Sequence, residues 1–318
     1  MNITLRQLRY FVEVAQSRSF SRAAEHLLIA QPALSQNIAS LEEDLGAKLF
    51  KRHARGVELS PEGHRLLSAA TEILARTSTL KEWIEGRDVL PSGPVRLSIS
   101  GSVASVLIAP LLRSMAEQYP AIELTVREGL SFESRAQVES GQAHLALMPS
   151  PSELQGMESL PIFEERFMLF GAFAAMRRKP ESLAFAEVAD LPLAAPDGAH
   201  DLRKIIERAA SAIDRRLDVQ YELNSPPMLI AVVKEGLAYS IMPPSACLEA
   251  VAAKSIAGRQ VVGPELSRVQ AVVWPRDRPL TPAAVATRDT VVRIIGELVL
   301  DGRLHGRLIE SSKKMKPK

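Results

Sequence analysis

Hydrophobic positions recur at helical spacing through most of the first sixty residues. They predict a helix over residues 5–17 and a second that contains Ala23, Ala24, Leu27 and Leu28. Thr4 and Gln7 have the form of a capping box for the first helix, and Ser19 or Ser21 can cap the second. A third helix opens at Gln31-Pro32, with proline at the first helical position, and stops at Gly46. Its predicted buried stripe is spaced four, three and four residues apart: Leu34, Ile38, Leu41 and Leu45.

A basic hairpin is predicted after the third helix. Leu49-Phe50 and Val57-Glu58-Leu59 can flank a turn at His53-Ala54-Arg55-Gly56. Four basic residues with no acid among them lie here: Lys48, Lys51, Arg52 and Arg55. The order of elements favours a winged helix-turn-helix whose arginines suit the minor groove and the phosphates. The alternative is a solvated charged hairpin.

The outward face of the third helix carries small and amide side chains: Ala33, Ser35, Gln36, Asn37 and Ser40. Glutamine can form two hydrogen bonds to adenine, serine can bond several bases, and alanine can contact the thymine methyl group. The acidic run Glu42-Glu43-Asp44 would be repelled by phosphate, so that end is expected to point away from DNA. From these residues alone, a recognition helix and a plain three-helix bundle with a polar outer face both stay open.

A long amphipathic helix is predicted from Ser60-Pro61-Glu62 onwards. Its apolar positions repeat as in a coiled coil: Leu66, Ala70, Ile73, Thr77, Leu80 and Ile84. Two such helices could pair into a dimer; the alternative is one helix packed on its own domain. Gly86 and Pro91-Ser92-Gly93-Pro94 mark a domain boundary.

From Val95 the pattern changes to short strands that alternate with helices. Strands are predicted at 95–99, 123–127, 144–148, 167–170, 193–195, 219–223, 238–242 and 268–274. Helices are predicted at 103–119, 131–140, 200–212, 226–235 and 282–300, with Pro110 as a kink or a restart in the first of them. Such alternation indicates parallel α/β layers, and the two similar halves suggest two subdomains with a cleft between them.

Three loops are candidates for binding a small molecule, because ligands of α/β sheets lie at the carboxyl ends of strands beside helix N-termini. These loops supply the predicted effector-binding residues Ser100, Gly101, Ser102, Val103, Gly129, Ser131, Pro196, Gly198 and His200. Their amides and hydroxyls could bind a carboxylate, and His200 could add a charge or a donor. The alternative is an ordinary helix cap for each serine and an ordinary surface histidine for His200.

Composition excludes several classes of protein. The chain has 318 residues, 46% of them hydrophobic and 24% charged, which is typical of a globular protein of two or three domains. No apolar run is long enough to span a membrane, and the start has no secretory signal, so a cytoplasmic protein without a membrane partner is expected. The single cysteine, Cys247, excludes an internal disulfide and a cysteine metal cluster. No metal ligands and no catalytic residues are predicted.

Charge is unevenly distributed along the chain. Residues 1–65 carry a net charge of +2, residues 66–302 carry −5 and residues 303–318 carry +5. This distribution suggests separate roles for separate segments, with a solvated basic tail at 303–318.

The motifs of the first 65 residues resemble those of LysR-type transcriptional regulators. The stretches that carry the resemblance are Leu5–Phe11, Ser19–Glu25, Gln31–Gln36, Leu41–Gly46 and Leu49–Arg52. Within the family, the chain looks like the nitrogen-assimilation-control type. Ala30 departs from the pattern, which often has Ser or Thr before Gln-Pro, so a helix cap would be lost.

The resemblance implies a winged helix-turn-helix at 1–60, a linker helix for dimerisation at 61–90, and an α/β effector-binding domain like the periplasmic binding proteins at 91–302. The latter would divide into subdomains of about 94–162 with 267–302, and about 163–266. The predicted DNA-binding residues are Ser21, Gln31, Pro32, Ala33, Ser35, Gln36, Arg52 and Arg55. Family members usually form dimers of dimers, so a homotetramer on double-stranded promoter DNA is expected, with RNA polymerase as a further candidate partner. No cofactor is implied beyond a small-molecule co-inducer.

Two other classes of function compete with this one. A solute-binding protein would use the same cleft without DNA, but the helix-turn-helix argues against it. An α/β enzyme with an accessory helical domain is the third; Gly129-Leu130-Ser131-Phe132-Glu133 begins like a nucleophile elbow but lacks its second glycine.

Overall fold

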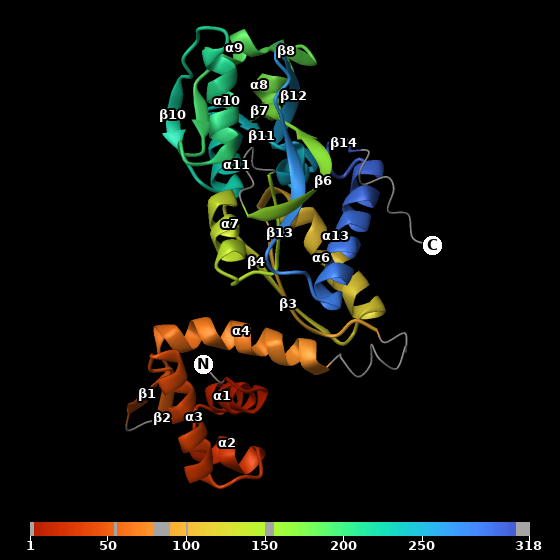
Figure 1. The fold of residues 1–318 in the computed structure, drawn as a ribbon. Helices are drawn as coiled ribbons and strands as arrows, with labels where there is room; N and C mark the ends of the chain where they lie inside the picture. Colours follow the sequence, from red (N-terminus) through yellow and green to blue (C-terminus); the bar gives the residue numbers. More distant parts are fainter. Residues whose placement is uncertain (1–2, 54–55, 79–89, 100, 150–155, 310–318) are drawn as a thin grey trace. The chain divides into compact units, whose positions relative to one another are not determined.

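The computed structural model describes residues 3–53, 56–78, 90–99, 101–149 and 156–309. The chain divides into two compact units, residues 1–94 and residues 95–318 (Figure 1).

Three helices form the first unit's core as predicted: α1 (Leu5–Ser17), α2 (Phe20–His26) and α3 (Gln31–Leu45). The capping box at Thr4 and Gln7 is present, and Ser19 rather than Ser21 caps α2. Leu34, Ile38 and Leu41 are buried, and the rings of Phe11 and Phe20 lie 5.3 and 5.7 Å from the ring of Phe50. The sequence pattern therefore predicts this core correctly.

Two details of these helices differ from the prediction. Leu28 lies beyond α2, since its backbone is left-handed (φ 54°) and the amide of Ile29 donates to the carbonyl of Ala24, a bond that closes the helix end. Helix α3 begins at Gln31, so Pro32 occupies its second position. The N-cap residue, Ala30, has no side-chain hydrogen bond to the helix, as its departure from the family pattern implies.

The predicted hairpin is present as strands β1 (Phe50–His53) and β2 (Gly56–Leu59), paired antiparallel. Glu42 of α3 holds its first strand, because its Oε1 accepts from the amides of Leu49 and Phe50 at 2.9 and 3.4 Å. The Nζ of Lys48 donates to the other carboxylate oxygen at 2.7 Å. Glu42, the first residue of the acidic run, therefore has a structural role in holding the hairpin, which the charge pattern of the sequence does not indicate.

Helix α4 (Pro61–Ser78) begins after Ser60, whose hydroxyl accepts from the amide of Gly63 at 2.9 Å. Ala70 is completely buried in the core of its own unit, and Leu66 packs against that core. Ala70 is thus used within the chain, as in the alternative of a helix packed on its own domain, and the pairing of two such helices stays a prediction. Ile73 is 42% exposed, and Leu80 and Ile84 lie outside the described residues.

The second unit contains a six-stranded sheet in the order β14-β6-β13-β5-β3-β4. Its strands are β3 (Gly93–Ile99), β4 (Ile122–Glu128), β5 (Leu145–Pro149), β6 (Met157–Arg166), β13 (Ser267–Pro275) and β14 (Gly306–Leu308). Its helices are α6 (Gly101–Gln118), α7 (Ser131–Glu139) and α13 (Pro282–Leu300). Helix α6 runs through Pro110 and packs with α13 in one apolar core on this sheet (Figure 1).

A four-stranded sheet in the order β11-β7-β12-β8 forms the rest of this unit, together with a parallel pair, β9 and β10. These strands are β7 (Met168–Ala172), β8 (Ser182–Ala184), β9 (Leu193–Ala195), β10 (Val219–Glu222), β11 (Ser240–Met242) and β12 (Ile256–Val262). The helices are α8 (Phe173–Met176), α9 (Phe185–Ala189), α10 (Asp201–Ser211), α11 (Pro226–Lys234), the 3-10 helix η1 (Pro244–Cys247) and α12 (Leu248–Ala252).

The expectation of parallel layers is only partly right. Strands β3 and β5 are parallel, but β13 runs antiparallel to both β5 and β6, and β7 runs antiparallel to β11 and β12. The chain leaves the first sheet along β6, through Phe167, and returns to it along β13. Because these neighbouring strands carry the chain in opposite directions, they pair antiparallel. The sequence pattern missed β6, β8, β12 and β14.

Candidate functional site

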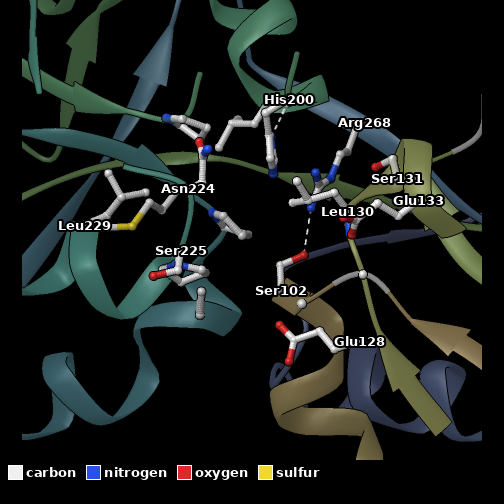
Figure 2. Close-up of a pocket in the computed structure, with 18 residues that line it drawn as sticks. Ser102, Glu128, Leu130, Ser131, Glu133, His200, Asn224, Ser225, Leu229 and Arg268 are labelled. Carbon is white, nitrogen blue, oxygen red and sulfur yellow. Dashed lines mark hydrogen bonds between the residues drawn. The ribbon is translucent and has the colours of Figure 1, made fainter. Parts of the chain in front are cut away.

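A pocket of about 410 Å³ lies where strand ends and helix starts of the second unit meet (Figure 2). Residues that follow β4, β9 and β11 line it, as do the first residues of α6, α7, α10 and α11. The unpaired amides at helix N-termini favour anionic or hydrogen-bond-accepting groups. Its volume is that of a site for a small molecule.

Six of the nine predicted effector-binding residues line this pocket: Gly101, Ser102, Gly129, Ser131, Pro196 and His200. Two do not. Val103 is fully buried in the core beneath α6, and Gly198 is exposed outside the pocket. Ser100 lies outside the described residues. The three loops named from the sequence therefore do meet in space.

Sequence reasoning missed several other residues of the pocket: Glu128, Glu133, Asn224, Ser225 and Arg268. Glu128, Asn224 and Ser225 end a strand or closely follow one, so the rule used for the other loops could have found them. Arg268 gave a weaker signal, a lone arginine near the start of the apolar strand β13.

Arg268 is the buried cation of the pocket, 9% exposed. Its Nε donates to Oε2 of Glu165 at 2.7 Å, and its Nη2 donates to the hydroxyl of Ser102 at 2.7 Å. Its guanidinium carbon also lies 5.2 Å from the ring centre of Phe167. Arg268 thus joins the pocket to both strands that connect the two sheets.

Glu165 is itself 1% exposed and also accepts from Gln270 Nε2 at 3.0 Å. Within the described part of the chain, its Oε1 has no hydrogen-bond partner. A buried carboxylate without its cation is costly, so the ion pair with Arg268 is what makes the burial of Glu165 tolerable.

His200 caps α10, since its Nδ1 accepts from the amide of Leu202 at 3.1 Å. Burial lowers the pKa of the His200 imidazole, and the nearby guanidinium of Arg268 lowers it further. The ring is therefore neutral at pH 7. Because Nδ1 is an acceptor, Nε2 carries the proton and is available as a donor.

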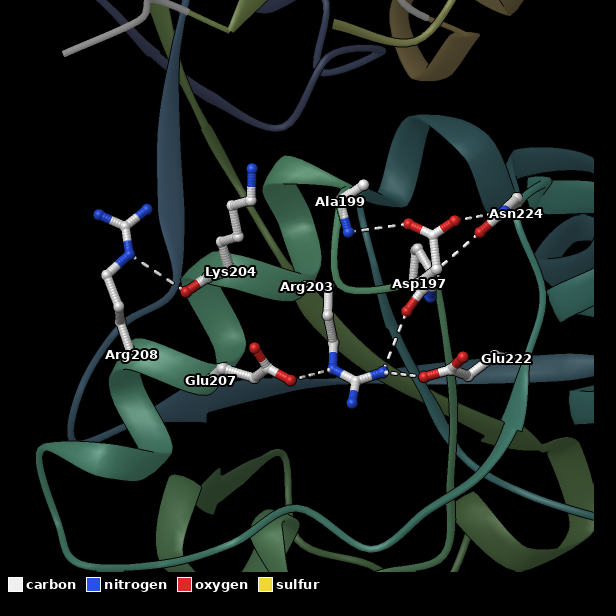
Figure 3. A network of polar contacts seen from close by, with 9 residues as sticks. Asp197, Ala199, Arg203, Lys204, Glu207, Arg208, Glu222 and Asn224 are labelled. Carbon is white, nitrogen blue, oxygen red and sulfur yellow. Dashed lines mark hydrogen bonds and ion pairs between the residues drawn. The ribbon is translucent and has the colours of Figure 1, made fainter. Parts of the chain in front are cut away.

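A pair of reciprocal hydrogen bonds fixes the loop that carries His200 (Figure 3). Asp197 donates its amide to Oδ1 of Asn224 at 3.0 Å and accepts from Nδ2 of Asn224 at 2.7 Å. Asp197 Oδ1 also accepts from the amide of Ala199 at 2.9 Å. The bond from Asn224, followed by the one from Ala199, lowers the pKa of Asp197, so this clasp contains a carboxylate at neutral pH.

Arg203 supports the same loop from α10. Its Nη1 donates to the carbonyl of Pro196 at 3.1 Å, and its Nε donates to Glu207 at 2.7 Å (Figure 3).

The predicted DNA-binding residues of the first unit lie on a polar surface. Ser21, Gln31, Pro32, Ala33 and Gln36 are exposed, and Ser35 is half-buried. Other polar residues of the same face have partners: Asn37 donates to the carbonyl of Ala33 at 2.8 Å, and Ser40 accepts weakly from Gln7 at 3.5 Å. Arg52 belongs to β1, and Arg55 lies outside the described residues.

Neither a metal cluster nor a membrane-spanning helix is present in the described part of the chain. It contains no group of three or more His, Cys, Asp or Glu side chains that could hold a metal ion. None of its helices is long and apolar enough to cross a membrane.

Two family descriptions match this chain. Residues 5–64 match "Bacterial regulatory helix-turn-helix protein, lysR family", and residues 89–294 match "LysR substrate binding domain". The relatives include the HTH-type transcriptional regulator BbuR of Bordetella bronchiseptica, 31% identical over 77% of this chain and 76% of BbuR. The nitrogen assimilation regulatory protein nac of Escherichia coli is 26% identical over 95% of this chain and 98% of its own length.

Solved structures agree with the fold. A cysteine mutant of OxyR from Corynebacterium glutamicum is 26% identical, with a TM-score of 0.68 over 94% of this chain and 95% of that chain. CbnR in complex with its target DNA is 21% identical, with a TM-score of 0.55 over 92% of this chain and 99% of that chain, and supports the fold alone. BbuR is described as a transcriptional regulator and nac as a regulatory protein. The chain belongs to the LysR family of DNA-binding transcriptional regulators, with a helix-turn-helix domain followed by an effector-binding domain.

Proposed function

We propose that this regulator reads promoter DNA with the exposed face of α3 and responds to a small molecule bound in the pocket beside Arg268. The observation that carries the effector site is the convergence of four helix N-termini and several strand ends on one pocket of about 410 Å³. Six residues named from the sequence lie there with a buried arginine. The proposal includes the domain boundaries that the sequence predicts and the division of the effector-binding domain into two subdomains.

The DNA-binding role rests on the exposed polar face of α3. Symmetric dimers would place two such helices in successive major grooves, about 34 Å apart. A pair of dimers, as is usual in the family, would place four such helices on the DNA. Contact with RNA polymerase belongs to the same proposal.

Gln36→Ala tests base reading. We expect this change to weaken binding to the specific site by about 1–3 kcal/mol and binding to random DNA much less, because alanine cannot hydrogen-bond to a base edge. Arg52→Ala is the contrasting variant; it should weaken binding to every sequence and reduce the salt slope by about 0.9 for each phosphate that the arginine neutralises. Fluorescence anisotropy at several salt concentrations measures both. Equal weakening by Gln36→Ala on both DNAs would exclude its base-reading role.

A ligand screen tests the pocket. Amino acids, aromatic acids, dicarboxylates and inorganic anions are added to the full chain, and the melting temperature is followed. A compound at 100 times its Kd should stabilise the protein by about 2.7 kcal/mol. Arg268→Lys should weaken a true pocket ligand, since lysine cannot reproduce the fork of bonds to Glu165 and Ser102. The control is Arg276→Lys, an exposed arginine just beyond the other end of β13. Unchanged affinity in Arg268→Lys would place the ligand elsewhere.

The relatives include probable hydrogen peroxide-inducible genes activators, one of them 30% identical over 76% of this chain. A thiol-based response is not supported here. Cys247 is the single cysteine, is fully buried, and burial raises its pKa to about 12. A thiol with so little thiolate is a poor nucleophile. We therefore infer an effector that binds rather than one that oxidises. The nitrogen-assimilation type stays a prediction, because its representatives are among several relatives of similar identity.

A further inference from the structure

The charges around the pocket do not suit a purely anionic ligand. Among the described residues that line it, four are ionisable: Glu128, Glu133, His200 and Arg268. Neutral His200 leaves Arg268 as their single cation, and Glu165 already pairs with it from behind at 2.7 Å. Carboxylates therefore outnumber the cation, and a second negative group on a ligand would meet the like charges of Glu128 and Glu133, which are both exposed at the pocket wall.

Glu128 differs from the other carboxylate of the pocket, Glu133, because its side chain has no partner among the described residues. It ends β4 and lines the pocket, and its carboxylate has no hydrogen bond or ion pair to another side chain or backbone group of the described residues. By contrast, Glu133 accepts from the amide of Leu130 at 2.9 Å. Glu128 lies so close to Gly101, the first residue of α6, that a Cβ there would collide with its carboxylate. The carboxylate of Glu128 therefore lies beside the start of α6, at the wall of the pocket.

Donors gather elsewhere in the same pocket. Figure 2 shows His200 and Arg268 side by side, with Ser102 below them and Glu128 beyond Ser102. The Nε2 proton of His200 and the hydroxyl of Ser131 can donate there, together with Arg268. These groups suit one carboxylate. Apolar side chains complete the lining: Leu202, Leu229, Met242 and Pro243.

We propose that the effector is a small zwitterion: an apolar body with one carboxylate, held by Arg268, Ser131 and His200, and one protonated amine that pairs with Glu128. This inference rests on the proposed effector site and narrows the class of its ligand. A dicarboxylate would face Glu128 with a like charge, and a simple amine would leave the donors around Arg268 unused.

A series of compounds with one six-carbon body tests the charges separately. Norleucine and 6-aminohexanoate carry both groups at two spacings, hexanoate lacks the amine, hexylamine lacks the carboxylate, and adipate has a second carboxylate. Calorimetric titration of the full chain measures each Kd. We expect one of the two zwitterions to bind at least about tenfold more tightly than the other three classes, the factor supplied by one charge-assisted hydrogen bond.

Glu128→Gln should remove this preference, so that the zwitterion binds no more tightly than hexanoate. Glu123→Gln is the matched control, since Glu123 is an exposed residue of the same strand and does not line the pocket. It should leave every affinity unchanged.

Three results would overturn the inference: binding of hexanoate or adipate as tight as that of the zwitterions, a preference that survives Glu128→Gln, or no binding of either zwitterion. If hexanoate or adipate binds as tightly as the zwitterions but Arg268→Lys weakens that binding, the proposed effector site still stands and only the zwitterion is excluded. Binding that neither Glu128→Gln nor Arg268→Lys changes would instead show that the pocket is not the effector site.

Discussion

At the scale of single residues, Arg268 links the pocket to the connection between the two sheets. Its guanidinium bonds Ser102 on one side and Glu165 on the other, and both neighbours are buried. In the proposed effector site, a ligand carboxylate bonded to Arg268 would change how this cation is shared with Glu165. That change would alter the contact between strands β6 and β13, because Glu165 and Arg268 are paired residues of these strands. A change in their packing is one route from ligand to assembly.

His200 gives the second unit a pH dependence. Its folded-state pKa lies below the usual 6.5, so the unfolded chain takes up a proton first as the pH falls. The stability contributed by the neutral ring is present above about pH 6.5 and is lost as the pH falls through the lowered pKa. Calorimetric melting between pH 7.5 and 5 measures this loss. In His200→Asn the drop should be smaller, whereas His305→Asn, at an exposed position, should match the parent chain. Identical curves for His200→Asn and the parent would contradict this assignment.

The clasp between Asp197 and Asn224 offers a test by exchange. Asp197→Asn brings two amide groups face to face, and Asn224→Asp brings two carboxylates together, so each change alone should lower the melting temperature and weaken ligand binding. Combining Asp197→Asn with Asn224→Asp restores a carboxylate opposite an amide, and all three hydrogen bonds can form again. We expect the double variant to recover most of the stability. Additive destabilisation would show that the clasp does not position the loop.

At the scale of elements, α3 carries the proposed DNA-reading surface and also supports the hairpin. Glu42 provides the support through the amides of Leu49 and Phe50. Glu42→Ala should destabilise the first unit by about 1–3 kcal/mol, because two backbone donors lose their acceptor. Glu43→Ala, on the exposed side of the same helix, is the control. Urea denaturation measures both, and equal stabilities would mean that water replaces the carboxylate without cost.

The N-terminus of α3 lacks a capping side chain, so a substitution there can stabilise the helix. Ala30 has the extended backbone of an N-cap residue (φ −69°, ψ 133°) but no side-chain oxygen to accept a bond. Ala30→Ser should raise the free energy of unfolding by about 1 kcal/mol, because serine can accept from a free amide of the first turn. Ala33→Ser, inside the helix, provides no cap and should not stabilise it. A gain no larger than that of Ala33→Ser would show that solvent already satisfies this helix end.

At the scale of the whole molecule, the regulator combines a DNA-reading unit and an effector-binding unit that contains a single, buried cysteine. Hydrogen peroxide at concentrations that oxidise exposed thiols should therefore leave DNA binding unchanged, and Cys247→Ser should bind DNA as the parent does. A gel-shift titration with and without peroxide provides the measurement. A peroxide effect that disappears in Cys247→Ser would show that the thiol becomes accessible and reactive.

Local signals in the sequence are enough to predict almost all of the first unit. Its helices, caps and hairpin follow from features such as Thr4 with Gln7, the stripe from Leu34 to Leu41, and Gly46, all within one or two turns of the chain. The loops of the pocket were also predictable, because strand ends and helix starts are local features that α/β sheets bring to one edge. The prediction that Leu28 belongs to the second helix is wrong. Its backbone is left-handed, and a leucine, unlike a glycine, does not indicate that conformation in the sequence.

Which polar residues meet depends instead on tertiary packing. Arg268 bonds Glu165 and Ser102 from positions more than a hundred residues away, and Ala70 is buried within its own chain. The opposite directions of β6 and β13 likewise depend on where the chain crosses between the sheets. No local pattern encodes these facts, because buried charges and strand directions are fixed by what packs around them, and that packing joins segments that are distant in sequence.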